Sequence, residues 1–224
     1  MNYKLSPSDL TFGYHGCKRC FHLKVVNGIS QPSIPLPSIF SQMANLLKDH
    51  YDGKHTKSLH KALPPGAVIL GEKRVKSDVI ELNSHKDTCY IAGRFDIVVS
   101  FDDGSYGVID FKTGSPSAES ANLYKRQLQA YAYALEHPAP RALTLFPITK
   151  LGLLYFYPSE INQKSIKRLS YRADIHWIEV ENNEDNFLGF IDEVMTFLEL
   201  PEAPEHSPTC QWCNYHKTLS QTDY

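Results

Sequence analysis

The pattern of apolar and polar positions predicts helices on either side of a central group of strands. Apolar residues recur at helical spacing through FSQMANLLKDHY, with Ser38 as the expected cap, in a short stretch KHTKSLHKAL, and in DNFLGFIDEVMTFLEL. Another helix is predicted over roughly 119–136. The segments AVILGEKRV, DVIEL, CYIAGRFDIVVSF, SYGVIDFK, LTLFPITKLGLLYFY and HWIEVE are typical of strands. We therefore expect an α/β fold, with a mixed β-sheet flanked by helices, in a single domain over residues 1–224.

The segment GRFDIVVSFDDGSYGVIDFKTG predicts a β-hairpin that carries three polar side chains. A three-residue DDG loop with its glycine in the left-handed conformation pairs residues whose numbers sum to 206. Asp96 then faces Asp110, and Lys112 shares their face because side chains alternate with a period of two. The same register places Phe95, Ile97 and Val99 opposite Phe111, Ile109 and Gly107 as one apolar face. A two-residue turn would send the two acids to opposite faces.

Facing carboxylates repel each other, so the hairpin predicts a compensating charge. A divalent cation such as Mg²⁺ or Mn²⁺ suits hard oxygen ligands, and a lysine two residues further on can steady a phosphate or orient a water. The alternative is a solvated sheet face on which Lys112 is a simple cross-strand partner. The next helix offers Gln127 and Tyr131 on one face, where they could position a phosphate or a base, or form a polar shoulder beside the core.

These motifs together resemble a known family. GRFD ending at Asp96, DFK at residues 110–112 and QLQAY from Gln127 to Tyr131 are similar to motifs of the PD-(D/E)XK nuclease superfamily in its RecB-like branch. With CxxC pairs near both ends, the chain resembles the CRISPR-associated iron–sulfur exonucleases. The resemblance implies a restriction-endonuclease-like core.

The resemblance also implies roles for these side chains. Asp96 and Asp110 bind the metal, Lys112 serves hydrolysis, and Gln127 and Tyr131 complete the site. The branch also has a metal-binding histidine on an early helix, for which His60 is the best match. His50 and His55 are rivals for that role.

Four of the five cysteines form two CxxC pairs, Cys17 with Cys20 and Cys210 with Cys213, in the terminal segments 1–30 and 200–224. A shared ligand would clamp the two ends together at a loop-closure cost that grows only logarithmically. Four thiolates can hold a structural Zn²⁺ or an iron–sulfur cluster, and the resemblance favours [4Fe-4S]. His15, His22 and His216 lie close enough in sequence to substitute as zinc ligands. Cys89 is expected to be a buried apolar residue.

Charge and composition narrow the range of functions. The formal charge of −2 gives no global attraction to nucleic acid, so local cations are needed, and Arg94, Lys125 and Arg126 are the candidates for backbone contact. The longest apolar run, LGLLYFY, is too short to cross a membrane, and the N-terminus lacks the apolar core of a signal peptide. A cytoplasmic location is expected, with no membrane partner.

The sequence favours a metal-dependent DNA nuclease. The expected form is a single-strand-acting exonuclease in DNA repair or CRISPR adaptation. The chain has no GxxxxGK[ST] phosphate loop, so a helicase or CRISPR integration partner would act in trans. The alternatives are a catalytically inactive nucleic-acid-binding or assembly subunit with the same fold, and a zinc-stapled protein with no nucleic-acid role.

Overall fold

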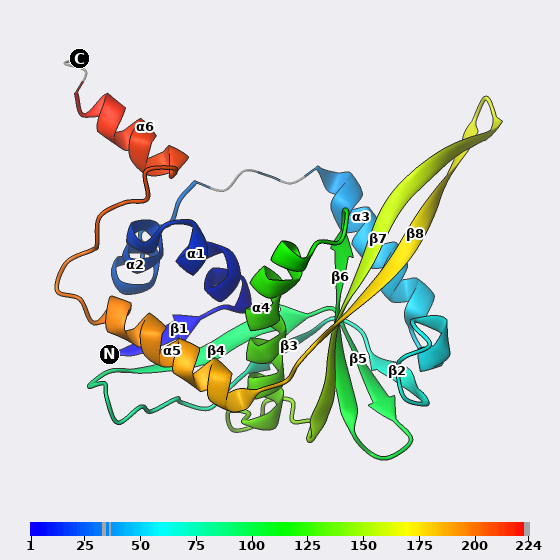
Figure 1. Ribbon diagram of the computed structural model, residues 1–224, viewed down its shortest axis with the longest axis horizontal. Helices are drawn as coiled ribbons and strands as arrows, with labels where there is room; N and C mark the ends of the chain where they lie inside the picture. Colours follow the sequence, from blue (N-terminus) through cyan, green and yellow to red (C-terminus); the bar gives the residue numbers. More distant parts are fainter. Residues whose placement is uncertain (33–34, 36, 222–224) are drawn as a thin grey trace.

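The computed structural model describes residues 1–32, 35 and 37–221. It is a mixed α/β structure with a curled sheet flanked by helices, which confirms the expected fold class (Figure 1). In chain order the elements are β1 (Asn2–Leu5), the π-helix η1 (Asp9–Gly13), α1 (Tyr14–Gly16), α2 (Lys18–Asn27), α3 (Ser38–Tyr51), the 3-10 helix η2 (Thr56–Ser58), β2 (Gly66–Leu70), β3 (Lys73–Lys76), β4 (Thr88–Phe95), β5 (Ile97–Phe101), β6 (Tyr106–Thr113), α4 (Ala118–Glu136), β7 (Ile148–Ser165), β8 (Arg168–Val180), α5 (Glu184–Leu198) and α6 (Gln211–Leu219).

The strands form two hydrogen-bonded groups that meet at one residue. One group has the order β1-β4-β3, and the other has the order β2-β5-β6-β7-β8. Strands β6 and β7 run parallel, whereas β2, β5 and β6 are joined antiparallel, as are β7 and β8. The chain passes from one group to the other between β4 and β5, at Asp96. This bend gives the sheet its curl and places a carboxylate at the junction.

The predicted register of the hairpin is confirmed. Ile97 pairs with Ile109, and Val99 with Gly107. The loop has three residues because Phe101 N–H donates to Ser105 O, and Gly104 has φ +85, a conformation that glycine adopts without strain.

The prediction that the apolar residues of this hairpin share a single face is wrong in part. Ile97 and Val99 belong to one core cluster, whereas Phe95 belongs to the other, on the opposite side of the sheet. The bend at Asp96 changes the direction of the chain between Phe95 and Ile97. Val98, which pairs with Val108 on the same face as Asp110, is fully buried because helices cover that face too.

Each face of the larger sheet has its own core. One core lies under α4 and α5 and includes Leu128, Leu151 and Phe187. The other contains Ile109 and Leu154 of the sheet, and residues that precede β2 cover it. Helix α4 begins with a reciprocal capping box between Ser117 and Ser120. The sheet is buried on both sides, so polar side chains can be enclosed on it.

The structure differs from several predicted elements. Ser38 is the first residue of α3, and Pro37 occupies the cap position in its place. KHTKSLHKAL contains only η2, and DVIEL contributes one isolated bridge between Ile80 and Cys89. Residues 143–147 of LTLFPITKLGLLYFY precede β7, and helices α2 and α6 were not predicted. The proline-rich connector over 31–38 lies partly outside the described residues.

None of the helices in the described part of the chain combines the length and apolar character needed to cross a bilayer.

Candidate active site and cysteine cluster

Asp96 lies where the β5–β6 ladder ends. Its Oδ2 accepts the backbone N–H of Phe111 at 2.9 Å, so the side chain takes the place of the next strand pairing. Its Oδ1 lies 2.9 Å from Nζ of Lys48 on α3. The carboxylate is therefore fixed against β6 beside Asp110, as the predicted register requires.

Asp110 is buried on β6 with only 4% of its surface exposed. Its Oδ2 lies 2.6 Å from Nζ of Lys112, two residues further along the same strand face. Burial raises the pKa of Asp110 to about 6, the lysine charge acts in the opposite direction, and the charge of Asp96 raises it further. The two carboxylates are thus close enough to repel each other, and a cation between them would relieve that repulsion.

Lys112 is held by a chain of hydrogen bonds that runs into α4. Its Nζ donates to Oε1 of Gln127 at 2.9 Å, and Nε2 of Gln127 donates to the hydroxyl of Tyr131 at 3.3 Å. The Tyr131 hydroxyl donates to the carbonyl oxygen of Arg94 at 2.6 Å. The amine also lies 3.7 Å from the centre of the Tyr124 ring. The spacing of four residues in QLQAY places two partners on one helical face, directed at the sheet.

Gly93 of the GRFD segment allows α4 to approach this closely. A Cβ atom at residue 93 would lie 2.6 Å from the Pro7 ring and 3.2 Å from the Tyr131 ring. The glycine therefore makes room for the tyrosine that ends the hydrogen-bond chain.

Sequence reasoning missed two charged residues of this cluster, Lys48 and Glu72. Oε2 of Glu72 lies 2.5 Å from Nζ of Lys48, which also contacts Asp96, and Oε1 of Glu72 pairs with Arg94. These two ion pairs lower the pKa of Glu72. Lys48 and Glu72 meet only because α3 and the start of β3 pack against the sheet. The spacing of residues along the sequence does not predict this contact.

The three cations expected to contact nucleic acid all have protein partners. Arg94 pairs with Glu72, and Lys125 lies 3.9 Å from Glu181. Arg126 donates to His15 at 2.8 Å, and its guanidinium carbon lies 3.5 Å from the centre of the Phe190 ring. Burial lowers the pKa of Arg126. Arg126 is built into the packing between α4 and α5, whereas the side chain of Arg94 is 54% exposed beside the carboxylates.

The structure does not bring His60 to the carboxylates. Its ring stacks on Trp177 of β8 with 5.8 Å between ring centres, and its Nδ1 accepts the N–H of Ala62. Trp177 packs against the core on the side of Leu154, opposite to the face of Asp110. Of the two rival histidines, His50 contacts Lys54, and His55 forms a β-bridge with Ala67.

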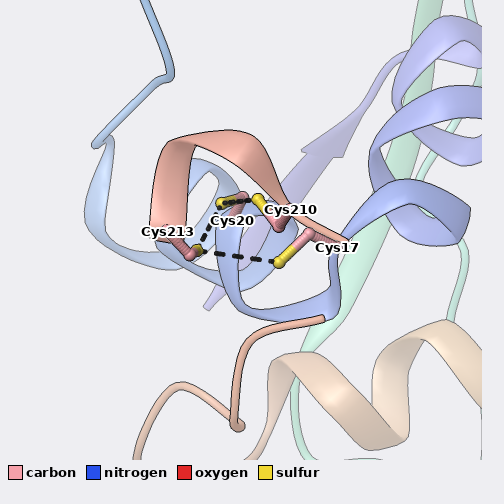
Figure 2. A group of neighbouring side chains, drawn as sticks. All are labelled: Cys17, Cys20, Cys210 and Cys213. Carbon is pink, nitrogen blue, oxygen red and sulfur yellow. Dashed lines mark hydrogen bonds between the residues drawn. The ribbon is translucent and has the colours of Figure 1, made fainter. Parts of the chain in front are cut away.

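The four cysteines of the two CxxC pairs meet in space, as Figure 2 shows. Cys17 and Cys20 come from the start of α2, and Cys210 and Cys213 from the start of α6. The Sγ atoms are 3.9 Å apart for Cys17 and Cys213, 3.7 Å for Cys20 and Cys210, and 3.3 Å for Cys20 and Cys213. All four atoms lie within 4.8 Å of one another.

This sulfur arrangement fits a single tetrahedral ion. Zn–S bonds of about 2.3 Å place tetrahedral sulfurs about 3.8 Å apart, close to the observed separations. In a [4Fe-4S] cluster each thiolate binds a different iron, which moves the sulfurs further apart. Burial opposes ionisation of the Cys17 thiol, but hydrogen bonds from the backbone at Cys20 and Ser207 lower its pKa to about 7. Burial raises the pKa of Cys20.

The histidines considered as zinc ligands lie elsewhere. Nε2 of His22 is 3.3 Å from the carbonyl oxygen of Leu200, and His15 contacts Arg126. His216 lines a neighbouring cavity between α2 and α6. Cys89 is fully buried in the larger core, as expected, and its burial raises its pKa to about 12.

The protein is thus an α/β protein in which two carboxylates and a lysine lie close together: Asp110 and Lys112 are on β6, and Asp96 is hydrogen-bonded to the backbone of that strand. Comparison with protein families places it further: the family model of the PD-(D/E)XK nuclease superfamily matches residues 36–218. The chain belongs to this superfamily. A search of curated proteins finds no match. Among solved structures, one described as "Crystal structure of SSO0001" is similar with 17% identity and a TM-score of 0.45, over 98% of this chain and 85% of that one.

The superfamily generally consists of nucleases that use divalent metals, and the residues present fit such an ion. Asp96 and Asp110 offer hard oxygen ligands, and burial together with the charge of Asp96 raises the pKa of Asp110, an effect that a bound cation would offset. Glu72 is a further carboxylate in the same cluster.

Proposed function

We propose that this protein is a DNA nuclease that hydrolyses phosphodiester bonds with Mg²⁺ or Mn²⁺ held by Asp96 and Asp110. The observation that carries the proposal is the position of Lys112. Its amine lies 2.6 Å from Asp110 and is fixed by Gln127 at 2.9 Å, so its charge is directed at the place where a bound phosphate would meet the cation.

A bound divalent ion would supply Lewis-acid chemistry and an activated water. The chain itself has three tasks. Asp96 and Asp110 hold the ion, and Lys112 stabilises negative charge on the phosphate oxygens. Gln127 and Tyr131 orient Lys112 through the hydrogen bonds that end at the Arg94 carbonyl. His60 has no part in this arrangement, since its ring packs against Trp177.

The finer proposal is an exonuclease that acts on single strands in DNA repair or CRISPR adaptation, within a single domain that spans residues 1–224. Its support is the resemblance of GRFD, DFK and QLQAY to the RecB-like branch. A helicase or integration partner would act in trans.

A cleavage assay on end-labelled single-stranded and duplex DNA tests the proposal. We expect cleavage with Mg²⁺ or Mn²⁺ and none with a chelator. Asp110→Asn and Lys112→Ala should each reduce the rate by at least about a hundredfold, since each removes charge from the reacting site. Asp102→Asn, an exposed change on the same hairpin, should leave the rate unaltered. Equal activity in Asp110→Asn and wild type would contradict the assignment.

A non-catalytic nucleic-acid-binding subunit is the second candidate. One observation favours it: Lys48 and Lys112 each contact one of the carboxylates, so the cluster is partly neutralised without an ion. This candidate requires that the wild-type protein bind DNA but leave it intact at saturating Mn²⁺.

For the cysteine site we propose one Zn²⁺ in place of the expected [4Fe-4S] cluster. The support is that all four sulfurs lie within 4.8 Å of one another, with three pairs at 3.3–3.9 Å, which suits one tetrahedral ion. Anaerobically purified protein should be colourless and contain one zinc per chain by elemental analysis. Brown protein with about four irons per chain would contradict this proposal.

A further inference from the structure

The last two strands of the sheet extend beyond it as a long two-stranded ribbon. Strand β7 pairs with β6 only as far as Phe156 opposite Thr113, yet it continues to Ser165, and β8 returns alongside it. Figure 1 shows this ribbon projecting beyond the rest of the sheet, at the upper right of the view. We call residues 157–176 the arm. Among its residues only Ser170 is not exposed.

One face of the arm continues the face that carries the proposed catalytic lysine. Lys112 is in register with Tyr155 of β7, which is in register with His176 of β8. Because side chains on paired strands share a face and alternate along each strand, this face continues along β8 through Asp174, Arg172 and Arg168. The eight steps along the strand from His176 to Arg168 cover about 26 Å at the usual strand rise.

The opposite face of the arm is apolar and continues a different part of the protein. Leu169, Tyr171 and Ile175 alternate with the residues just named and lie on the side of Trp177. Of the two faces of the arm, the polar face is therefore the one that is continuous with the face of the sheet that carries Asp110 and Lys112.

The arm is positively charged in a chain that is negative overall. It contains four basic residues, Lys164, Lys167, Arg168 and Arg172, and two acidic residues, Glu160 and Asp174, whereas the whole chain has a formal charge of −2. Arg172 lies 3.8 Å from Glu160. Within the described residues, the side chains of Lys164, Lys167 and Arg168 have no ion-pair partner. Tyr157, 43% exposed on the polar face, offers an aromatic ring at the base of the arm.

We propose that the polar face of the arm binds the nucleic-acid strand that enters the catalytic cluster. Arg168 on this face contacts the backbone phosphates together with Lys164, at a bulge near the end of β7, and Lys167, in the turn at the tip of the arm, and Tyr157 stacks on a base next to the site. Charge complementarity and the continuous face from Lys112 identify a polyanionic strand as the occupant. This inference rests on the proposed nuclease function and assigns the substrate contacts that Arg126 and Lys125, engaged in internal contacts, do not supply.

The test compares two variants with the same loss of charge. The arm variant carries Lys164→Gln, Lys167→Gln and Arg168→Gln, and the control variant carries Lys4→Gln, Lys57→Gln and Lys86→Gln, three exposed lysines on other parts of the surface. Binding of a fluorescent 20-nucleotide strand is followed by anisotropy in EDTA at 50 and 200 mM salt. Cleavage of four-nucleotide and 20-nucleotide strands is measured separately with Mn²⁺.

We expect the arm variant to bind the 20-nucleotide strand at least about tenfold more weakly at 50 mM salt and to lower the salt slope by about 2, because three phosphate contacts are lost. The control variant should stay within about threefold of wild type. Cleavage of the four-nucleotide strand, too short to reach the tip of the arm, should be equal in both variants and wild type. Equal melting temperatures would exclude a folding defect.

Other outcomes separate the two proposals. If wild type binds and cuts DNA but the arm variant binds as tightly, or both variants weaken equally, the arm assignment is wrong and the nuclease assignment stands. If the arm variant changes only the oligomeric mass, the occupant is a second copy of the chain. If wild type neither binds nor cuts DNA, both proposals fail.

Discussion

Tyr131 shows how one hydroxyl supports a charged group two contacts away. The hydroxyl receives a hydrogen bond from Gln127, which holds Lys112, and it donates to the carbonyl oxygen of Arg94 next to Asp96. Burial raises the pKa of this phenol, so it stays protonated and remains a donor at neutral pH. The side chain therefore links α4 to β4, through the Arg94 carbonyl, and to Lys112 on β6, through Gln127.

Tyr131→Phe should remove both hydrogen bonds of the hydroxyl without leaving a cavity in the core. The Arg94 carbonyl loses its side-chain donor, which should lower the free energy of unfolding by about 1–2 kcal/mol in urea titration. Gln127 loses its partner, so Lys112 becomes less well oriented, and kcat should fall with little change in KM. Tyr215→Phe, a change at a tyrosine that is 59% exposed, should alter stability by less than about 0.5 kcal/mol. Unchanged kcat in Tyr131→Phe would argue against a positioning role.

The residues that sequence reasoning identified are those whose neighbours follow from local geometry. Asp110 and Lys112 share a face because strand side chains alternate, and Gln127 and Tyr131 share one because four residues make about one helical turn. Lys48 and Glu72 were missed because their contacts with each other and Asp96 join different elements. A histidine was misplaced for the same reason: only the folded chain shows His60 stacked on Trp177.

At the scale of elements, α3 acts on the site through a single side chain. Much of the helix is exposed, but Lys48 extends from its last turns to Asp96 and Glu72. The buried surroundings lower the pKa of Lys48, but the two carboxylates outweigh this and raise it. The amine of Lys48 thus supplies a positive charge beside Asp96, and a divalent ion that binds Asp96 would compete with it.

Lys48→Met should therefore tighten metal binding. Removing a competing ion pair at a half-buried site should lower the apparent Kd for Mn²⁺ by about fivefold, corresponding to about 1 kcal/mol, because the ion no longer displaces an amine from Asp96. Calorimetric titration of Mn²⁺ measures this change. Lys57→Met, an exposed change on η2, serves as the control and should bind Mn²⁺ as wild type does. Weaker Mn²⁺ binding by Lys48→Met would instead make the lysine a support for the site.

Element prediction succeeded where one periodic pattern was strong. The β5–β6 hairpin, α4 and α5 were expected from alternation, turn chemistry and helical spacing. Helices α2 and α6 were missed because both are short, with 10 and 9 residues, and few of their side chains enter the core: α2 buries Phe21 and His22, and α6 buries no residue. The arm was missed because the β7 half, from Pro158 to Ser165, is mostly polar and gives no strand pattern, although polar and apolar residues alternate along the β8 half.

At the scale of the whole molecule, the cysteine cluster joins two terminal helices that differ in how firmly they pack against the core. Helix α2 packs into the main core through Phe21, whereas α6 buries no residue of its own. A cavity of about 700 Å³, lined by Leu23 and Trp212 among others, lies between the two helices. The attachment of α6 to the protein thus depends mainly on Cys210 and Cys213.

Removing the proposed ion from this cluster should release α6 while the rest of the protein stays folded. Without a bound ion, no metal–thiolate bonds offset the entropy that is lost when the segment after α5 is ordered. The core under α4 and α5 keeps its contacts, so the rest of the protein should stay folded. Limited proteolysis after treatment with a strong zinc chelator should cut within residues 205–221, and mass spectrometry should identify the remaining body.

Cys213→Ser should show the same cleavage without a chelator, whereas Cys89→Ala, which removes a buried thiol outside the cluster, should not. Global loss of the near-ultraviolet circular dichroism signal on chelation would instead mean that the cluster stabilises the entire fold.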